Sequence, residues 1–420
     1  MSKFFERTIS TKFKELSENF PVVLITGPRQ VGKTTLLRDF IDNNERKITF
    51  VTLDNLNDRS LALENPELFL RTYEPPVVID EFQYAPDLLS YIKIKIDEMR
   101  YEALKNGTDP NGQYFLTGSQ VFQTMEKVGE SLAGRVGILN LYSLSEREIE
   151  KIEDNKFLPK IEDIKNKKNT KRYSTSKLYE KILNGGYPEL WKNQNLNRND
   201  FFNEYIKTYM ERDIRQLINL KDELKFIRFI QSVAARTGQV TNIDDISSDV
   251  GVSNNTGNEW FSILVNTGIV MLLQPYYNNN LSRIIKSPKL YMTDTGLACY
   301  LTGYMDAMVL ERSMYNGAIF ETYVVNEIVR SYANQGLDPS KYLYYYRDKD
   351  KKEIDILIED NKTIYPIEIK KNSKIDKDAI KNFDVLKATG FEIGNGSVIC
   401  MAEKIMPLDE KNYIIPIEYI

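Results

Sequence analysis

Histidine is absent from this sequence of 420 residues, and cysteine occurs only at Cys299 and Cys400. The lack of histidine excludes triads and general bases that depend on it, together with nearly all zinc-hydrolase designs. Two cysteines provide neither a disulfide framework nor a thiolate zinc site. Any catalytic metal would therefore need oxygen ligands, which favour Mg²⁺ or Mn²⁺.

Long apolar runs and a strong excess of one charge are also missing. No stretch approaches the roughly 20 apolar residues that span a bilayer. The first residues contain no apolar signal region, so we expect a cytoplasmic protein with no membrane partner. The net charge of −4 argues against a nucleic-acid-binding surface over the whole protein, but a local basic groove remains possible. The chain is too long for one hydrophobic core, so several domains are expected.

One segment combines an apolar strand, a glycine-containing loop and the beginning of a helix. The loop and the first helical residues are Gly27, Pro28, Arg29, Gln30, Val31, Gly32, Lys33, Thr34 and Thr35. Gly27 and Gly32 allow backbone N–H groups to face a nucleotide's phosphates, and the helix presents its positive end. Lys33 can bridge the β- and γ-phosphates, and the Thr34 hydroxyl can bind Mg²⁺. This context predicts a nucleotide site.

A second apolar strand, Val77 to Ile79, is followed by Asp80 and Glu81. Asp80 is placed to hold Mg²⁺ through water, and Glu81 can polarise an attacking water molecule. The alternative is a buried strand that ends in two solvated acids. A carboxylate beside a metal ligand suits attack by water better than transfer to a small metabolite. A small-molecule kinase is therefore a distant third possibility.

Further apolar strands are expected at residues 48–53, 113–117 and 136–141, with helical patterns between them, such as 87–104. This alternation indicates an α/β fold with a parallel sheet covered on both faces. Ser119 follows one of these strands, where it either senses the γ-phosphate or caps a turn. Arg135 precedes the last strand and resembles the arginine finger of AAA+ ATPases, which completes a neighbouring subunit's site. A surface arginine is the other reading.

The middle of the chain is less specific. Residues 146–172 are dense in charge, which favours a solvated helix followed by a mobile connector. Residues 240–265 read as a helix, a glycine turn and a second helix, and 272–288 could form a wing. Such a unit either binds DNA or docks a protein. The DNA hypothesis uses polar side chains for the groove and basic ones for phosphates: Asn254, Asn255, Asn258, Arg283, Lys286 and Lys289.

A second group of chemically active residues lies near the C-terminus. Residues 352–358 and 363–370 alternate as strands, and a turn at 360–362 would set Asp355 opposite Glu368. Glu368 and Lys370 share a face. The three resemble the PD-(D/E)xK nuclease core, in which acids hold Mg²⁺ and lysine helps activate water. Glu321, on a helix expected at 317–333, fits the upstream acid. A charged outer face of a sheet gives similar alternation.

The motifs together resemble a family of AAA+-type ATPases of bacteria and archaea. The resemblance covers nearly the whole chain and rests on residues 27–37, 78–81, 116–119, 132–135, 185–189, 211–214, 289–296 and 320–321. It implies a P-loop ATPase domain over 1–172, with the charged connector at its end. It further implies a helical lid over 173–221, a winged helix-turn-helix over 222–305 and a restriction-endonuclease-like α/β domain over 306–420.

The sequence therefore predicts a multidomain, oligomeric, Mg²⁺-dependent ATPase that acts on DNA. ATP would be bound by residues 27–35 with Asp80 and Ser119, and hydrolysed with the help of Lys33, Glu81 and Arg135. A C-terminal site would hold Mg²⁺ or Mn²⁺ on carboxylates and use a lysine: Glu321, Asp355, Glu368 and Lys370. The alternative is an ATP-controlled switch that grips DNA or a protein without cleaving it.

Overall fold

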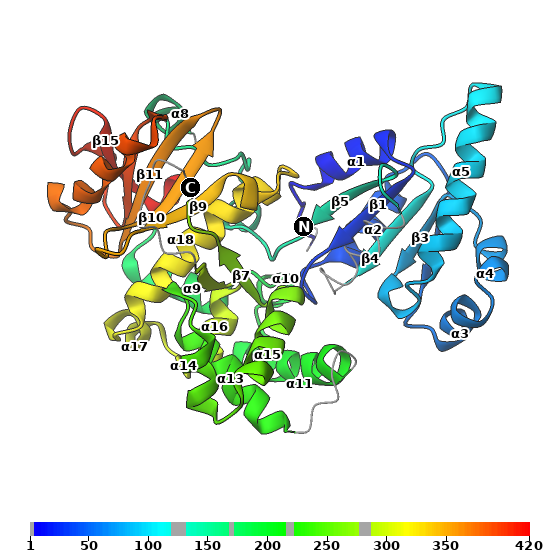
Figure 1. The fold of residues 1–420 in the computed structure, drawn as a ribbon, viewed down its shortest axis with the longest axis horizontal. Coiled ribbons are helices and arrows are strands. Elements are labelled where there is room, and N and C mark those ends of the chain that lie inside the picture. The colour runs from blue at the N-terminus through cyan, green and yellow to red at the C-terminus, as the bar shows by residue number, and fades with distance from the viewer. Residues whose placement is uncertain (1–3, 119–131, 168–171, 216–221, 277–286) are drawn as a thin grey trace. The chain divides into compact units, whose positions relative to one another are not determined.

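The computed structural model describes residues 4–118, 132–167, 172–215, 222–276 and 287–420. It divides into an N-terminal unit, mainly the chain up to Leu144, and a second unit that contains most of the chain from Ser145 onward (Figure 1). None of the helices in these described ranges is long and apolar enough to cross a membrane.

The N-terminal unit is built on a five-stranded parallel sheet in the order β2-β3-β4-β1-β5 (Figure 1). Its strands are β1 (Val22–Thr26), β2 (Thr49–Thr52), β3 (Val77–Asp80), β4 (Tyr114–Gly118) and β5 (Val136–Asn140). Every residue of the three central strands is buried, as their continuous apolar runs indicate. The predicted α/β fold with a parallel sheet is confirmed.

Helices connect and cover these strands: α1 (Ser10–Asn19), α2 (Lys33–Asp42), α3 (Leu56–Glu64), α4 (Pro66–Thr72) and α5 (Leu88–Asn106), with the short η1 (Phe82–Tyr84) after β3. Asparagine side chains cap two of them, because Asn55 accepts from the N–H of Asn57 and Asn65 from that of Leu68. The helix expected over 87–104 is α5, which ends at Gly107 in a left-handed conformation.

The second unit begins with helices: α7 (Glu146–Glu150), α8 (Ile161–Asn166), α9 (Thr175–Asn184), α10 (Pro188–Lys192), α11 (Arg198–Tyr209) and the π-helix η2 (Met210–Ile214). Next come α13 (Glu223–Ala235), α14 (Ile243–Val250) and α15 (Asn254–Asn266). A small antiparallel sheet in the order β6-β8-β7 accompanies them, made of β6 (Gln239–Val240), β7 (Val270–Leu273) and β8 (Lys289–Met292).

Gly257 lies inside α15, where glycine weakens a helix. A Cβ at this position would lie 1.9 Å from the Ser247 Oγ of α14. The glycine is therefore required by the close crossing of the two helices, which brings their backbones together.

The last part of the second unit packs α16 (Thr295–Leu301), α17 (Ala307–Arg312) and α18 (Asn316–Ala333) with a seven-stranded mixed sheet. The main strand order is β14-β15-β13-β11-β10-β9, and β12 pairs with β11. The strands are β9 (Leu343–Arg347), β10 (Glu353–Asp360), β11 (Thr363–Lys370), β12 (Glu392–Ile393), β13 (Gly396–Cys400), β14 (Met406–Pro407) and β15 (Asn412–Pro416). Three 3₁₀ segments complete it: η3 (Pro339–Lys341), η4 (Lys377–Thr389) and η5 (Ile417–Tyr419).

The hairpin expected near residue 361 is present between β10 and β11. Asn361 and Lys362 have φ angles of 52° and 65°, which is the backbone of a two-residue type I′ turn. This turn fixes the antiparallel register, in which Asp360 faces Thr363 and Ile356 faces Ile367.

The expectation of a solvated segment over 146–172 is wrong for its first part. Arg147 and Glu148 are buried, and the buried Lys181 of α9 lies 2.5 Å from Glu146 and 2.7 Å from Glu150. The charges are compensated by one another and not by water. Composition alone does not distinguish these two situations.

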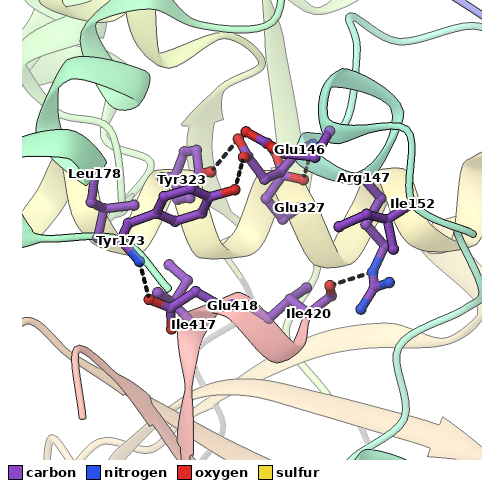
Figure 2. Close-up of a pocket in the computed structure, with 11 residues that line it drawn as sticks. Glu146, Arg147, Ile152, Tyr173, Leu178, Tyr323, Glu327, Ile417, Glu418 and Ile420 are labelled. Atoms are coloured by element: carbon purple, nitrogen blue, oxygen red, sulfur yellow. Dashed lines mark hydrogen bonds between the residues drawn. The ribbon is translucent and has the colours of Figure 1, made fainter. Parts of the chain in front are cut away.

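A pocket of about 30 Å³ lies beside this charged cluster, lined from α7, α9, α18 and the last residues of the chain. Figure 2 shows its lining residues. Tyr173 and Tyr323 both donate to Glu146, at 2.8 and 3.2 Å. The backbone N–H of Glu146 donates to Glu327 at 2.8 Å. None of the lining residues belongs to the phosphate loop (residues 27–34) or to the acids at the end of β3, Asp80 and Glu81. We therefore attribute this pocket to the packing around the charged segment 146–172.

Glu327 provides a test of this packing. Burial raises the pKa of Glu327 to about 7, although Arg330 donates to it at 2.6 Å. The folded state therefore binds this proton more tightly than the unfolded state, and stability is lost as pH rises through about 7. Between about pH 5 and pH 7 the melting temperature of wild type should fall more steeply than that of Glu327→Gln, because this interval lies between the ordinary pKa of 4.5 and the raised pKa. The exposed Glu180→Gln is the matched control, and equal slopes for wild type and Glu327→Gln would contradict the assignment.

Candidate functional site

The phosphate loop leaves the C-terminal end of β1, near the middle of the parallel sheet, and leads into α2. Gly27 has φ +141°, and a Cβ there would lie 2.1 Å from the carbonyl oxygen of Leu141. Gly32, immediately before α2, has φ +101°. Both positions therefore require glycine, one for close approach of two backbones and one for its dihedral angle.

The Lys33 ammonium lies within the loop. Its Nζ donates to the carbonyl oxygens of Gly27 at 2.9 Å and Pro28 at 2.8 Å. The side chain is buried, so these oxygens supply the partners that water does not.

Three side chains and one backbone N–H group converge where α2, β3 and β4 meet. Thr34 Oγ1 donates to the Asp80 carboxylate, with both oxygens at 3.1 Å. Thr117 Oγ1 of β4 donates to Asp80 Oδ1 at 2.5 Å and accepts from the backbone N–H of Glu81 at 3.1 Å. Glu81 has φ 56° and ψ 41°, a left-handed conformation that is costly for this residue type. Thr117 thus holds the Asp80 carboxylate and the backbone of Glu81 together at the end of β3.

Neutral donors surround Asp80, although Lys33 is near enough to act on it. Burial raises the pKa of Asp80, and the negative charge of Glu81 raises it further. The hydrogen bonds from Thr117 and Thr34 oppose this rise. Oxygen ligands of this kind suit Mg²⁺, and Thr34 and Asp80 already lie together, so these residues fit the cation expected with a nucleotide.

Two residues of this site were not predicted. The hydroxyls at the end of the strand that contains Thr117 were expected to sense the γ-phosphate or to cap a turn, whereas the Thr117 hydroxyl joins Asp80 to Glu81. Arg7 is buried, and its guanidinium donates to the carbonyls of Val31 and Tyr142, each at 2.8 Å. Arg7 thereby links the phosphate loop to the segment that follows β5. Nothing in its local sequence signals this role.

The remaining predicted residues of the N-terminal unit are less informative. Ser119 lies outside the described residues. Arg135 forms a two-point ion pair with Asp97 of α5, with Nε–Oδ1 at 2.7 Å and Nη2–Oδ2 at 3.1 Å. The hydrogen bond from Arg135 lowers the pKa of Asp97. Within this unit, therefore, Arg135 is held by its own chain.

The C-terminal residues Asp355, Glu368 and Lys370 are brought together on β10 and β11. Because Ile356 faces Ile367, the preceding Asp355 lies opposite Glu368, as the hairpin predicted. Lys370 Nζ donates to Glu368 Oε2 at 2.7 Å, and Asp355 Oδ2 accepts from the N–H of Ile369 at 2.8 Å. Burial, with the negative charge of Asp355, raises the pKa of Glu368 to about 8.

Lys289 corrects one expectation. It was assigned to the phosphates of DNA, but its side chain is only 2% exposed and its ammonium lies among carboxylates. Nζ is 3.1 Å from Glu321 Oε1, 2.5 Å from Glu353 Oε1 and 3.6 Å from Asp355 Oδ1. Burial lowers the pKa of Lys289, but Tyr291 and these three acids outweigh burial and hold it well above its ordinary value. Glu353 was not predicted as a member of this group.

This arrangement does not fit the metal implied by the nuclease resemblance. Across the described ranges, no three histidine, cysteine or acidic side chains are placed so that they could hold a metal ion. Near β10, the Lys289 ammonium already lies between Glu321, Glu353 and Asp355.

Comparison with known proteins agrees with the geometry of the N-terminal unit. Residues 19–150 match a family model described as an AAA domain. This region is an AAA-type ATPase domain. Residues 175–307 and 316–420 match two further models, each described as a domain of unknown function (DUF8612 and DUF4143).

Relatives extend over most of the chain. Uncharacterized proteins of Mycobacterium tuberculosis and Mycobacterium bovis are each 27% identical over 368 residues, which is 87% of this chain and 74% of theirs. Among solved structures, the Walker-type ATPase PABY2304 of Pyrococcus abyssi has 17% identity and a TM-score of 0.44, covering 71% of this chain and 96% of that one. RuvB of Thermotoga maritima has 17% identity and a TM-score of 0.29, covering 63% and 88%. Scores this low assign no activity.

The hydroxyl of Thr117 gives the site a direct test. Thr117→Val keeps the shape of the side chain but removes the donor to Asp80 and the acceptor for Glu81. A lost bond to a buried carboxylate should slow ATP hydrolysis by roughly 10- to 100-fold, with a smaller effect on nucleotide binding. Phosphate release and titration with a fluorescent nucleotide measure the two effects. Thr49→Val, at an exposed position of β2, is the control, and an unchanged hydrolysis rate in Thr117→Val would argue against this role.

Proposed function

We propose that this protein is a Mg²⁺-dependent ATPase whose hydrolytic cycle controls its grip on DNA. The observation that carries the ATPase part is the convergence of Thr34, Asp80, Thr117 and Glu81 beside a phosphate loop. The DNA part rests on the second unit and is tested separately.

In this proposal the loop N–H groups and Lys33 bind the phosphates of ATP. Phosphate oxygens replace the carbonyls of Gly27 and Pro28 as acceptors for the Lys33 ammonium. Thr34 and Asp80 hold the cation, which supplies charge neutralisation along the phosphate chain when bound. Glu81, fixed through its N–H to Thr117, orients the attacking water and accepts its proton.

The helix pair α14 and α15 supports contact with DNA. Their close crossing at Gly257 and the neighbouring three-stranded sheet agree with a winged helix. Asn254, Asn255 and Asn258 are exposed on α15, where amide side chains can read base edges. Lys289 no longer belongs to the phosphate-contacting set, because it is buried and ion-paired.

One observation favours binding without cleavage over a nuclease. PD-(D/E)xK chemistry needs a divalent metal on the acids, but Lys289 lies between three of them. A switch in which the C-terminal domain contributes to gripping DNA or a protein partner is therefore favoured over a nuclease.

Glu81→Gln separates ATP binding from hydrolysis. The amide keeps the size of the side chain but accepts no proton, so phosphate release should fall by about 10²- to 10³-fold while ATP still binds. If ATP controls the grip, this variant should retain labelled duplex or branched DNA with ATP longer than wild type does. Lys33→Ala, which removes the phosphate-binding ammonium, should lose both effects. Phosphate release from Lys33→Ala at the wild-type rate would contradict the ATPase assignment. DNA retention that is the same with and without ATP would contradict the nucleotide-controlled switch.

Arg135 and Asp97 test whether a second copy completes the site. If Arg135 acts on the ATP of a neighbouring subunit, Arg135→Ala should reduce hydrolysis by roughly 10³-fold or more. Asp97→Asn breaks the same ion pair but leaves the guanidinium, so it should hydrolyse ATP at least as fast as wild type. Equal, small losses in both variants would instead identify a structural ion pair. Phosphate release measured over a range of protein concentrations distinguishes these results.

A further inference from the structure

Lys289 lies in a cluster of acidic side chains, and the residues of this cluster come from three different elements. It begins β8, whereas Glu321 belongs to α18 and Glu353 and Asp355 belong to β10. The ammonium has carboxylate oxygens at 2.5, 3.1 and 3.6 Å, so it is the shared partner of all three acids. Carboxylate oxygens are also the ligands that a hard divalent cation takes.

The neighbouring groups strengthen this arrangement. Tyr291, two residues further along β8, donates its hydroxyl to Glu321 Oε1 at 2.7 Å. Arg347 of β9 pairs with the other oxygen of Glu353 at 3.1 Å. Lys370 lies against Glu368 at 2.7 Å and is the more exposed partner. Lys289 is thus the deeply buried cation, while the other basic groups lie around the rim.

We propose that Lys289 is the resident cation of this cluster, that it closes the cluster to divalent metal, and that removing its charge uncovers a divalent-cation site. The proposal deepens the C-terminal part of the proposed function and does not depend on ATP hydrolysis. The ammonium and a divalent ion need the same carboxylate oxygens, so they exclude one another. Loss of Lys289 leaves buried carboxylates uncompensated, which is costly unless another cation replaces it.

The same contact joins two parts of the second unit. β8 belongs to the three-stranded sheet β6-β8-β7, and the acids belong to the C-terminal sheet and to α18. The two sheets also meet where Pro275 bridges to Tyr345. Lys289 can therefore leave the acids only if β8 shifts or its own side chain withdraws. Whether a divalent cation can reach the carboxylates therefore depends on where β8 places the Lys289 side chain.

Mn²⁺ binding tests the proposal with the whole 420-residue chain in the absence of nucleotide. Isothermal titration with Mn²⁺ should show no Asp355-dependent site in wild type. Lys289→Met should gain one, about tenfold or more tighter than any binding in wild type, and its melting temperature should rise with Mn²⁺. Adding Asp355→Asn to Lys289→Met should abolish the gain, which separates this site from the nucleotide loop. Lys381→Met, which removes an exposed lysine, is the charge-matched control and should behave as wild type.

Lys289→Gln provides a second variant that keeps a hydrogen-bonding group without the charge. Gain of the Asp355-dependent site in either variant, including folding that is restored by Mn²⁺, supports the proposal. Asp355-dependent binding in wild type, or no binding by both variants, overturns it. Phosphate release by wild type is measured in parallel, so a failed ATPase assignment is distinguished from a failed metal result.

Discussion

A carboxylate removed from water must receive hydrogen-bond donors or a counter-charge, and both candidate sites of this chain are organised by that requirement. Asp80 is buried at the end of β3 and receives hydroxyl donors from Thr34 and Thr117. Neutral donors stabilise the carboxylate without cancelling its charge. The attraction for a cation therefore remains, which is the state that a nucleotide site requires before its ligand arrives.

The C-terminal acids meet the same requirement differently. Asp355 receives the N–H of Ile369, but the cluster as a whole is compensated by the full charge of Lys289. A salt bridge of this kind is stable as long as both partners remain, and breaking one side is strongly unfavourable. The two sites use the same residue type, yet one is prepared for an external cation and the other already contains an internal one.

The sequence predicts those features that depend on neighbours along the chain. The parallel sheet follows from continuous apolar runs, and the turn at Asn361 and Lys362 follows from local backbone preference. That turn then sets Asp355 opposite Glu368, so the position of these two acids relative to each other is predictable from the sequence. Even the connection between Thr34 and Asp80 follows from the spacing of two motifs.

The remaining features depend on pairing between distant segments. Arg7 contacts Val31 and Tyr142, which lie 24 and 135 positions away, and no local pattern encodes such contacts. Lys181 turns a charged segment into a buried one by pairing with Glu146, 35 positions earlier. Lys289 looked like a surface cation because lysine usually is one. Its burial is decided by acids from α18 and β10, which sequence spacing does not bring together.

The charge of the C-terminal cluster explains why lysine and a divalent metal are alternatives. Four acids lie there, Glu321, Glu353, Asp355 and Glu368, and three basic groups neutralise them, Lys289, Arg347 and Lys370. With all four acids ionised the balance is one negative charge, and it is zero when Glu368, whose pKa is raised to about 8, holds a proton. In either state a divalent ion added to this set would leave an excess positive charge next to a buried ammonium. Coulomb repulsion over a few ångströms in a poorly solvated site opposes that state strongly. Without Lys289 the same acids, when all four are ionised, carry two uncompensated negative charges, which a divalent ion matches. Which cation the cluster holds is thus decided by where β8 places one side chain.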